Sequence, residues 1–381
     1  MAVDTRVAIA ASPAAEIRAA GEVVVYRLHD LGYEIDLEQA VVRLGDRAPE
    51  RARPTRGEAQ AIQVRNPPVT VDLGTATLTL TGGDAIAELS ARIFDFGVAS
   101  FRTRVRFPNP APWSEFVVWG AACASAPDWQ EVFGRAREEL QGRIAPAITH
   151  GHESPVIEDY TVFRVDRLVD AAGARVSAAG LRDEDVAHLL TGESRPLSAA
   201  ARRDLLSQRF TYYEDDLAVL TWNAALVVEP VAADTDVQYV LEFANAQLLE
   251  LRYYDALLDG ELPRMYDHIV AARTGFHLVG RRYSRVLASL QARVAEVTEL
   301  VERSENAIKM TDDVFLARIY AAALEIFRGR AWRQGIDGKL AIVRDTYTML
   351  NAESQARRAE VLELIIVILI LLEIVLAFWR H

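Results

Sequence analysis

The chain has 381 residues, of which 51% are apolar and 25% charged, and its formal net charge is −12. This length leaves room for two or three domains and the apolar fraction for a sizeable core. The acidic balance argues against direct nucleic-acid binding, and Cys123, the only cysteine, excludes an intrachain disulfide.

The first 230 residues predict a mixed α/β head. Short segments rich in Val, Thr and aromatic residues and bounded by Gly, Pro or Asp are typical of strands. They lie at 23–26, 75–80, 101–107, 161–165, 217–222 and 225–228. Segments 84–94 and 129–144 predict helices between the strands, and Gly82-Gly83-Asp84 is a turn and N-cap signal for the first. We expect the head to occupy 1–230, with any division into two lobes near 150–160.

The part of the chain after residue 236 predicts a helical domain over 236–360. Three long segments without strand signals predict helices at 237–262, 277–328 and 336–379. Apolar residues in the second and third segments recur at alternating spacings of three and four, the heptad pattern of packed helices. Gly329, Gly335 and Gly338 predict the turn between these two helices, so we expect a long antiparallel helical hairpin.

Residues 361–379 are mostly apolar and predict a single C-terminal transmembrane helix. Nineteen residues span roughly 28 Å as a helix, close to the about 30 Å of a hydrocarbon core. The residues placed as membrane-interface anchors are Arg357, Arg358, Trp379 and Arg380. The fold class expected is therefore α+β, with an α/β head, a helical hairpin and one membrane span.

The cellular location expected from this span is the bacterial inner (cytoplasmic) membrane. Arginine strongly outnumbers lysine, which is typical of GC-rich bacterial genomes, and basic residues precede the span. That charge bias favours a single-pass protein with the bulk of the chain in the cytoplasm. The alternative for 361–379 is a helix buried within a soluble oligomer.

The predicted helix 237–262 carries a polar stripe. Its members fall within an arc of about 140° at 100° per residue, and they are Glu242, Asn245, Arg252, Asp255 and Asp259. Two of the carboxylates follow Arg252 by three and seven positions, so we expect a structural polar network that fixes packing register. A solvated face and a catalytic site are the alternatives.

Glu373 lies near the middle of the predicted span. An acidic side chain there is rare and seldom faces lipid, so we expect Glu373 to be an intramembrane oligomer contact. Glu363 lies nearer the boundary, where it can reach water and needs no partner. Together with the heptads, this glutamate predicts a homo-oligomer that contacts the lipid bilayer.

The remaining clusters predict no catalytic residue, cofactor or metal site. Glu214-Asp215-Asp216 lacks the Asp-x-Asp-x-Asp-Gly pattern of a calcium loop and is typical of an acidic turn. His150-Gly-His152-Glu153 lacks the spacing of a zinc motif and is typical of a surface loop. Phosphate-binding, dinucleotide-binding and nucleophile-elbow motifs are also missing from the sequence.

Three stretches in the second half of the chain carry a family resemblance. They are Ser207-Gln-Arg-Phe-Thr-Tyr-Tyr-Glu-Asp-Asp-Leu-Ala-Val-Leu-Thr-Trp, Leu241-Glu-Phe-Ala-Asn-Ala-Gln-Leu-Leu-Glu-Leu-Arg-Tyr-Tyr-Asp, and Trp332 with Lys339-Leu-Ala-Ile-Val-Arg-Asp-Thr-Tyr. Residues 206–381 resemble a domain-of-unknown-function family whose eukaryotic members are called required-for-meiotic-nuclear-division proteins. The resemblance implies a membrane-anchored protein with an α/β head and a helical hairpin. Its mitochondrial member is associated with the inner membrane, forms large homo-oligomers and supports mitochondrial translation.

The function expected is that of a C-terminally anchored, self-associating scaffold whose head is an interaction module for an unknown protein partner. Two alternatives belong to other classes. One is a membrane-proximal enzyme that depends on carboxylates or a metal, supported by the stripe on 237–262 and the acidic turn at 214–216. The other is an oligomeric pore or transport accessory, in which a ring of Glu373 side chains would line the pathway.

Overall fold

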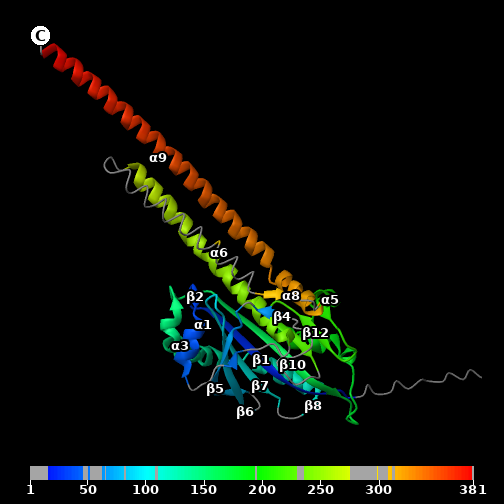
Figure 1. Ribbon diagram of the computed structural model, residues 1–381. Helices are drawn as coiled ribbons and strands as arrows, with labels where there is room; N and C mark the ends of the chain where they lie inside the picture. Colours follow the sequence, from blue (N-terminus) through cyan, green and yellow to red (C-terminus); the bar gives the residue numbers. More distant parts are fainter. Residues whose placement is uncertain are drawn as a thin grey trace, which may run out of the picture. The chain divides into compact units, whose positions relative to one another are not determined.

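A computed structural model of the protein describes residues 16–45, 50–51, 62–64, 66–80, 83–107, 110–193, 195–229, 236–274, 298, 308–310 and 314–379 (Figure 1). The chain forms two compact units, and each contains two separate stretches of sequence. Unit 1 consists of Met1–Glu250 and Ser304–Gly329, and unit 2 consists of Leu251–Arg303 and Arg330–His381. The head of unit 1 therefore continues beyond residue 230, and a later segment returns to it.

Unit 1 is built on a ten-stranded sheet. Its strands, in the order in which they lie side by side, are β11 (Arg209–Phe210), β12 (Leu217–Leu220), β13 (Ala224–Val228), β10 (Ile157–Val169), β1 (Arg18–Asp30), β7 (Val98–Arg106), β6 (Gly83–Ile93), β5 (Val69–Leu80) and β3 (Glu50–Arg51), with β8 (Ala111–Pro112) also paired to β1. Neighbouring strands are antiparallel except β10 and β13, which are parallel. Two small sheets pair β2 (Glu34–Ile35) with β9 (Ile148–Thr149), and β4 (Ile62–Val64) with β14 (Ile308–Met310).

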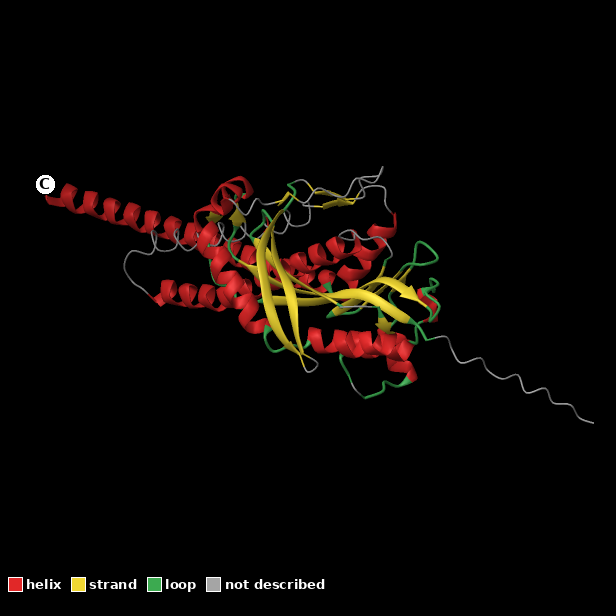
Figure 2. Ribbon diagram, turned by 90° about the horizontal axis from the view of Figure 1, so that it is seen from below, coloured by secondary structure: helices red, strands yellow, loops and turns green. Residues whose placement is uncertain are grey.

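Helices cover both faces of this sheet (Figure 2). On one face, Val23 and Val25 of β1 join the main apolar core with residues of the early helices. These helices are α1 (Leu37–Leu44), α2 (Trp113–Ala124), α3 (Trp129–Ile144) and α4 (Asp183–Thr191), accompanied by α5 (Ala199–Leu205) and the 3-10 turns η2 (Ala145–Ala147) and η3 (Ala178–Gly180). Since both faces are covered, β1 is buried along almost its whole length instead of at alternate residues, and the buried positions include charged ones such as Glu22 and Asp30.

The opposite face of the sheet packs against the beginning of α6 (Asp236–Thr274) and against α8 (Val314–Ile326). Phe243 of α6 contacts Phe94 and Phe96 at ring distances of 5.9 Å, and Phe327, just after α8, lies 5.7 Å from Tyr160 of β10. All five rings are buried. These contacts explain why 304–329 belongs to unit 1 although it is distant in sequence.

A bulge between Ala20 and Gly21 shifts the register of β1 against β10. A Cβ at Gly21 would lie 2.0 Å from the carbonyl oxygen of Arg164, so only glycine fits this close approach. The bulge sets the alternation of the next residues, which places Glu22 directly opposite Arg106 of β7 and Arg164 of β10.

Unit 2 contains the later part of α6 and nearly all of α9 (Gly329–Trp379). Leu258 of α6 is buried, and so are Ile336, Leu340 and Val343 of α9, which follow the spacing of four and three that predicted a packed seam. Most of the predicted helix 277–328 lies outside the described residues, at 277–297, 299–307 and 311–313, and with it most of the expected hairpin partner of α9.

Several sequence expectations are corrected by the secondary structure. Segment 84–94, predicted as a helix, is β6, because tertiary pairing with β5 and β7 overrides the helix propensity of its Ala, Glu and Leu residues. No strand was expected after residue 236, yet β14 pairs with β4. Gly335 and Gly338, which were predicted to form a turn, lie inside α9. The break between α8 and α9 comes at Arg328, whose φ is 53°.

The predicted transmembrane helix at 361–379 is wrong. Within the part of the chain that the structure describes, no helix is both long enough and apolar enough to cross a membrane. The α+β class with a large sheet stands, whereas the membrane span and the location derived from it do not.

Candidate functional site

The polar stripe predicted on α6 is divided between the two units. Glu242 and Asn245 lie in unit 1, where their side chains are almost completely buried. Glu242 forms an ion pair with Arg92 of β6, and the Asn245 side chain donates a hydrogen bond to the Leu241 carbonyl at 2.8 Å. The guanidinium of Arg92 also lies 4.8 Å from the centre of the Tyr239 ring. The sheet therefore supplies the charged partner of Glu242, and that partner is Arg92, which the sequence analysis did not select.

Arg252, Asp255 and Asp259 lie in unit 2, where a lysine of α9 joins the two carboxylates. The Lys339 Nζ atom is 2.7 Å from Asp255 Oδ1 and 2.6 Å from Asp259 Oδ1. Burial acts to lower the pKa of Lys339, but the hydrogen bonds to the two aspartates outweigh it and raise this pKa. Lys339 thus ties α6 to α9 within unit 2.

A second charged cluster crosses the sheet face that carries Arg92. Glu22 of β1 is buried and lies 3.1 Å from Arg164 of β10, 3.2 Å from Arg104 of β7 and 4.0 Å from Arg106 of β7. A buried carboxylate needs such partners, since its unpaired charge would cost several kcal/mol. Arg106 differs from the other two arginines because 68% of its side chain is exposed, and its contacts with Glu22 and Glu88 are both at 4.0 Å.

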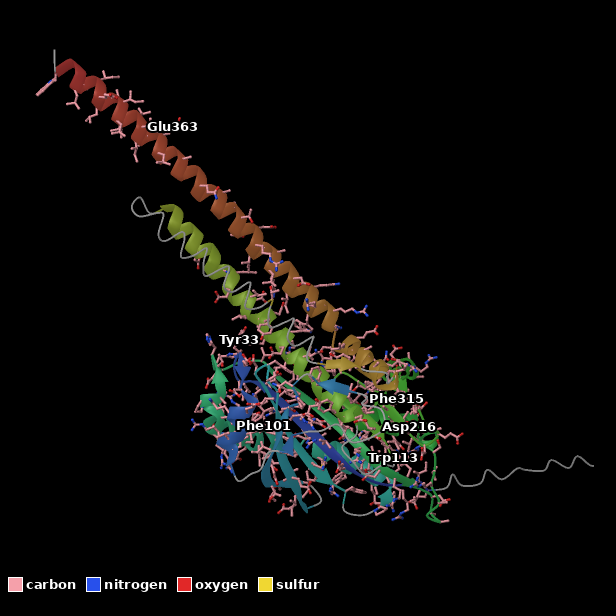
Figure 3. All side chains as sticks on the ribbon, in the orientation of Figure 1. Tyr33, Phe101, Trp113, Asp216, Phe315 and Glu363 are labelled. Carbon is pink, nitrogen blue, oxygen red and sulfur yellow. The ribbon has the colours of Figure 1, made fainter. Side chains whose placement is uncertain are left out.

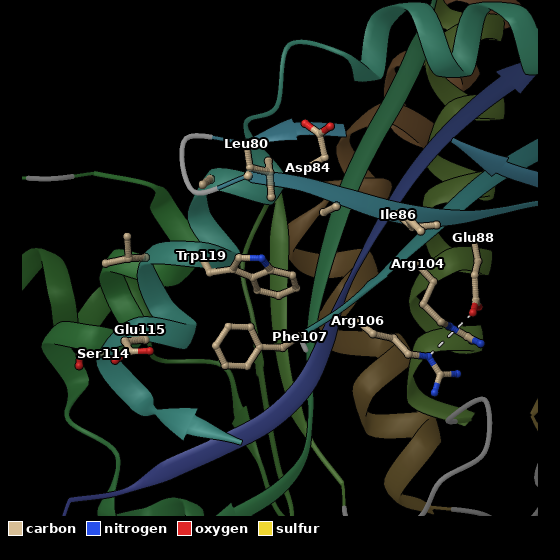
Figure 4. A pocket seen from close by; sticks show the side chains of 14 residues that line it. Leu80, Asp84, Ile86, Glu88, Arg104, Arg106, Phe107, Ser114, Glu115 and Trp119 are labelled. Atoms are coloured by element: carbon tan, nitrogen blue, oxygen red, sulfur yellow. Dashed lines mark ion pairs between the residues drawn. The ribbon is translucent and has the colours of Figure 1, made fainter. Parts of the chain in front are cut away.

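An open hollow of about 1000 Å³ lies next to this cluster (Figure 4). We call it the β6 hollow, and its lining residues are Leu80, Gly83, Asp84, Ala85, Ile86, Glu88, Arg104, Arg106, Phe107, Ser114, Glu115, Val118, Trp119 and Ala122. Phe107 and Trp119 pack against each other at a ring distance of 4.9 Å, while the arginines lie at the other end of the view. Half of the lining side chains are apolar, a composition common to binding pockets.

A histidine–aspartate pair, of which the aspartate is buried and the histidine partly exposed, lies at the end of β1. His152 Nε2 is 3.0 Å from Asp30 Oδ2, and the backbone N–H of Gly32 donates to Asp30 Oδ1 at 3.2 Å. Burial raises the pKa of Asp30, although the hydrogen bond with His152 opposes that shift. The neighbouring His29 is buried, and its burial together with the charges of Arg137 and Arg27 lowers its pKa to about 4. His152 was read as part of a surface loop because Asp30 is far away in the sequence.

The surroundings of the acidic turn at 214–216 and of Cys123 indicate structural roles. Asp216 Oδ1 accepts a hydrogen bond from the Tyr212 N–H at 2.8 Å, as expected for an acidic turn. Cys123 is buried, which raises the pKa of its thiol to about 12. Among the described residues, no group of three or more His, Cys, Asp or Glu side chains is placed to hold a metal ion.

The C-terminal part of α9 presents apolar side chains on every side of the helix. Thirteen Leu, Ile and Val residues between positions 362 and 376 are each between 46% and 61% exposed. Glu363 and Glu373 are exposed in the same stretch, and Figure 3 labels Glu363 there. Of the expected anchors, Trp379 is 90% exposed, the side chains of Arg357 and Arg358 are not among those described, and Arg380 lies outside the described residues.

Comparison with known proteins gives a family for the N-terminal half. A sequence profile described as "Uncharacterized protein MJ0711, N-terminal domain" matches residues 20–235. The uncharacterized protein MJ0711 of Methanocaldococcus jannaschii is 24% identical over 174 residues, covering 46% of this chain and 52% of that protein. The chain therefore spans about half the length of the curated relative it matches. No solved structure matches the chain.

These matches bear on two expectations. The relative is archaeal, which argues against the bacterial membrane location expected from composition and the C-terminal segment. The profile covers most of the sheet of unit 1, where the resemblance found from the sequence begins only at residue 206, and it supports a domain family of unknown function without the meiotic name. Since the matched region exceeds half of the chain, the protein belongs to the family described as the N-terminal domain of the uncharacterized protein MJ0711.

Proposed function

We propose that the protein is a self-associating scaffold whose unit 1 is an interaction module. The observation that carries this proposal is the apolar surface of α9 between positions 362 and 376. A helix that is apolar all round is stable only when other groups surround it. Copies of the same segment, packed side by side in a bundle, would supply those groups.

The magnitude of the exposed surface supports association. Thirteen side chains, each about half exposed, present on the order of 1,000 Å² of apolar surface, whereas monomers rarely expose more than a few hundred in one patch. At about 25 cal/mol per Å², covering half of it contributes roughly 12 kcal/mol before the entropic cost of association. Micromolar association needs about 8 kcal/mol net, so this gain supports it when the entropic cost of association is near the low end of its range, about 4 kcal/mol.

Glu373 would lie at a contact between helices in such a bundle. Buried among apolar side chains of other copies, its carboxyl group would need a proton or a hydrogen-bond partner. Glu363, ten residues earlier and also exposed, lies at the beginning of the apolar stretch, where the polar residues before it keep water within reach. The two glutamates therefore form a matched pair for testing the role of Glu373.

We also infer that the resemblance of residues 206–381 to the required-for-meiotic-nuclear-division proteins reflects relationship in the second half of the chain. The stretches 207–222 and 241–255 support this, and the large homo-oligomers of the mitochondrial member agree with self-association here.

Multi-angle light scattering of the full chain, with and without a mild detergent, tests the proposal. We expect an oligomer of defined mass in both conditions. Replacing Ile366 and Leu369 by Asn should reduce the mass to that of a monomer, while circular dichroism stays unchanged because both side chains are exposed. Glu373→Leu should alter the assembly and Glu363→Leu should not. A wild-type chain that is monomeric in detergent would show that amphiphiles, not other copies, cover the helix, and would refute self-association.

A further inference from the structure

The β6 hollow lies along an open strand edge. β6 pairs with β5 over its whole length, down to Gly83 opposite Leu80, but its pairing with β7 begins only at Ala87, opposite Val105. Among the described strands, residues 83–86 of β6 therefore have a partner on one side only. An open edge of this kind presents backbone N–H and C=O groups that can pair with an added strand.

The edge is open because β7 pairs with β1 further along than it pairs with β6. The pairing with β6 ends at Val105, whereas the backbone N–H of Phe107 still donates to the Gly21 carbonyl of β1 at 2.9 Å. The Phe107 ring then packs against Trp119 and Phe116 of α2, at 4.9 and 5.4 Å. The space that a longer β7 would fill is the β6 hollow, and four residues of edge correspond to about 13 Å of added strand.

The two faces of the sheet give this space two different walls. On the α2 face lie Ala85, Val118 and Trp119, and Val118 is 65% exposed although it is apolar. On the other face lie Ile86, which is 69% exposed, the carboxylate of Glu88, and the guanidinium groups of Arg104 and Arg106 (Figure 4). Since side chains of a strand alternate between faces, an added strand would direct apolar groups to the first wall and meet charged groups at the second, where Arg106 is the guanidinium nearest to Ile86.

The charge at the end of the edge selects which end of a peptide fits. An added strand must stop beside Ile86, because β7 occupies the edge of β6 from Ala87 onward. A peptide that ends there with its amino terminus would bring an ammonium group toward Arg106, which is repulsive. A peptide that ends with its carboxyl terminus brings a carboxylate to an exposed guanidinium, which is a strong charge-assisted pairing.

We propose that the β6 hollow binds the C-terminal segment of a partner polypeptide, as a short strand parallel to β6 whose terminal carboxylate pairs with Arg106. Backbone hydrogen bonds to residues 83–86 supply affinity that is independent of the peptide sequence. The apolar wall at Val118 and Trp119 selects an apolar side chain one or two positions before the terminus. The site lies entirely within unit 1 and does not depend on α9 or on self-association.

The test uses the full chain and a panel of fluorescein-labelled hexapeptides with randomised last three residues. Each peptide is made with a free carboxyl terminus and with an amidated one, and binding is followed by fluorescence anisotropy. We expect free-carboxyl peptides with apolar residues near the terminus to bind, and amidation to weaken them about tenfold or more, the usual effect of losing a charged hydrogen bond. Arg106→Gln should cause a similar loss, and Val118→Glu should abolish binding.

Matched controls separate the site from general surface effects. Arg135→Gln removes another largely exposed arginine, and Val42→Glu places a charge at another exposed valine, on α1, so both should bind the peptides like the wild type. The proposal is overturned if no peptide of the panel binds, if amidated and free peptides bind equally, or if the control variants lose binding as the site variants do. The α9 variants Ile366→Asn and Leu369→Asn should retain peptide binding, so this result and the oligomer result are independent.

Discussion

The buried ion pair between Arg92 and Glu242 predicts a large and specific loss of stability when only one partner is removed. The Arg92 side chain is 7% exposed and that of Glu242 is 1% exposed, so neither charge can turn to water. In Arg92→Met, the Glu242 carboxylate is left buried without its cation, which typically costs about 3–5 kcal/mol. Loss of the contact between Arg92 and the Tyr239 ring adds roughly 0.5–2 kcal/mol.

The double variant Arg92→Met/Glu242→Leu should behave differently. Removing both charges removes the desolvation penalty together with the attraction, so the unfolding free energy should return to within about 1–2 kcal/mol of the wild type. Arg135→Met is the control, because Arg135 and Glu131 form an exposed ion pair that is worth about 1 kcal/mol at most.

Urea unfolding followed by tryptophan fluorescence measures these differences, since Trp113 and Trp129 are buried in the core of unit 1. With a slope of about 3 kcal/mol per M, Arg92→Met should lower the transition midpoint by about 1–2 M. The reasoning is refuted if Arg92→Met unfolds at the same urea midpoint as Arg135→Met. It is also refuted if the double variant loses as much unfolding free energy as Arg92→Met and Glu242→Leu lose together.

Two further predictions concern other charged groups. Lys339→Met leaves the carboxylates of Asp255 and Asp259 without their shared cation, and should destabilise unit 2 by about 1 kcal/mol at neutral pH; unchanged thermal unfolding would contradict this role for the lysine. The folded-state pKa of His29 is lowered to about 4, so between pH 6.5 and 4 the unfolded state binds the proton first and stability falls as the pH falls. His29→Gln should flatten this decline in urea titrations at pH 4.5 and 7, and an equally steep decline in the variant would exclude His29 as its origin.

The strands with simple local signals could be predicted from the sequence, and the helix α3 (Trp129–Ile144) was predicted with its observed bounds. The apolar run at 23–26 lies within β1, and segment 161–165 lies within β10. β6 was predicted as a helix because its Ala, Glu and Leu residues have high helix propensity. Its apolar residues nevertheless alternate from 85 to 93, the period of a strand, and the pairing with β5 and β7 follows that alternation.

The candidate sites were less predictable, since they depend on partners that are distant in the chain. Arg92 and Glu242 are 150 residues apart, and Glu22 and Arg164 are 142 residues apart. The i, i+3 and i, i+4 spacings of a helix cannot reveal such pairs. The β6 hollow depends on where β7 ends and Phe107 turns to Gly21, which is a property of strand register and leaves no motif in the sequence.

The interleaving of the two units along the chain has a consequence for synthesis and for dissection of the molecule. A fragment that stops at Glu250 lacks Phe327, and would expose the Tyr160 ring that Phe327 covers in the intact protein. During synthesis on the ribosome, one edge of β1 stays unpaired until residues near 160 have been made. The sheet itself is covered only after residues near 320 have been made. Contacts between residues so distant in sequence slow folding, and apolar surface stays exposed in the nascent chain until they form. Expression of the head alone should therefore fail unless residues 304–329 are grafted onto its end.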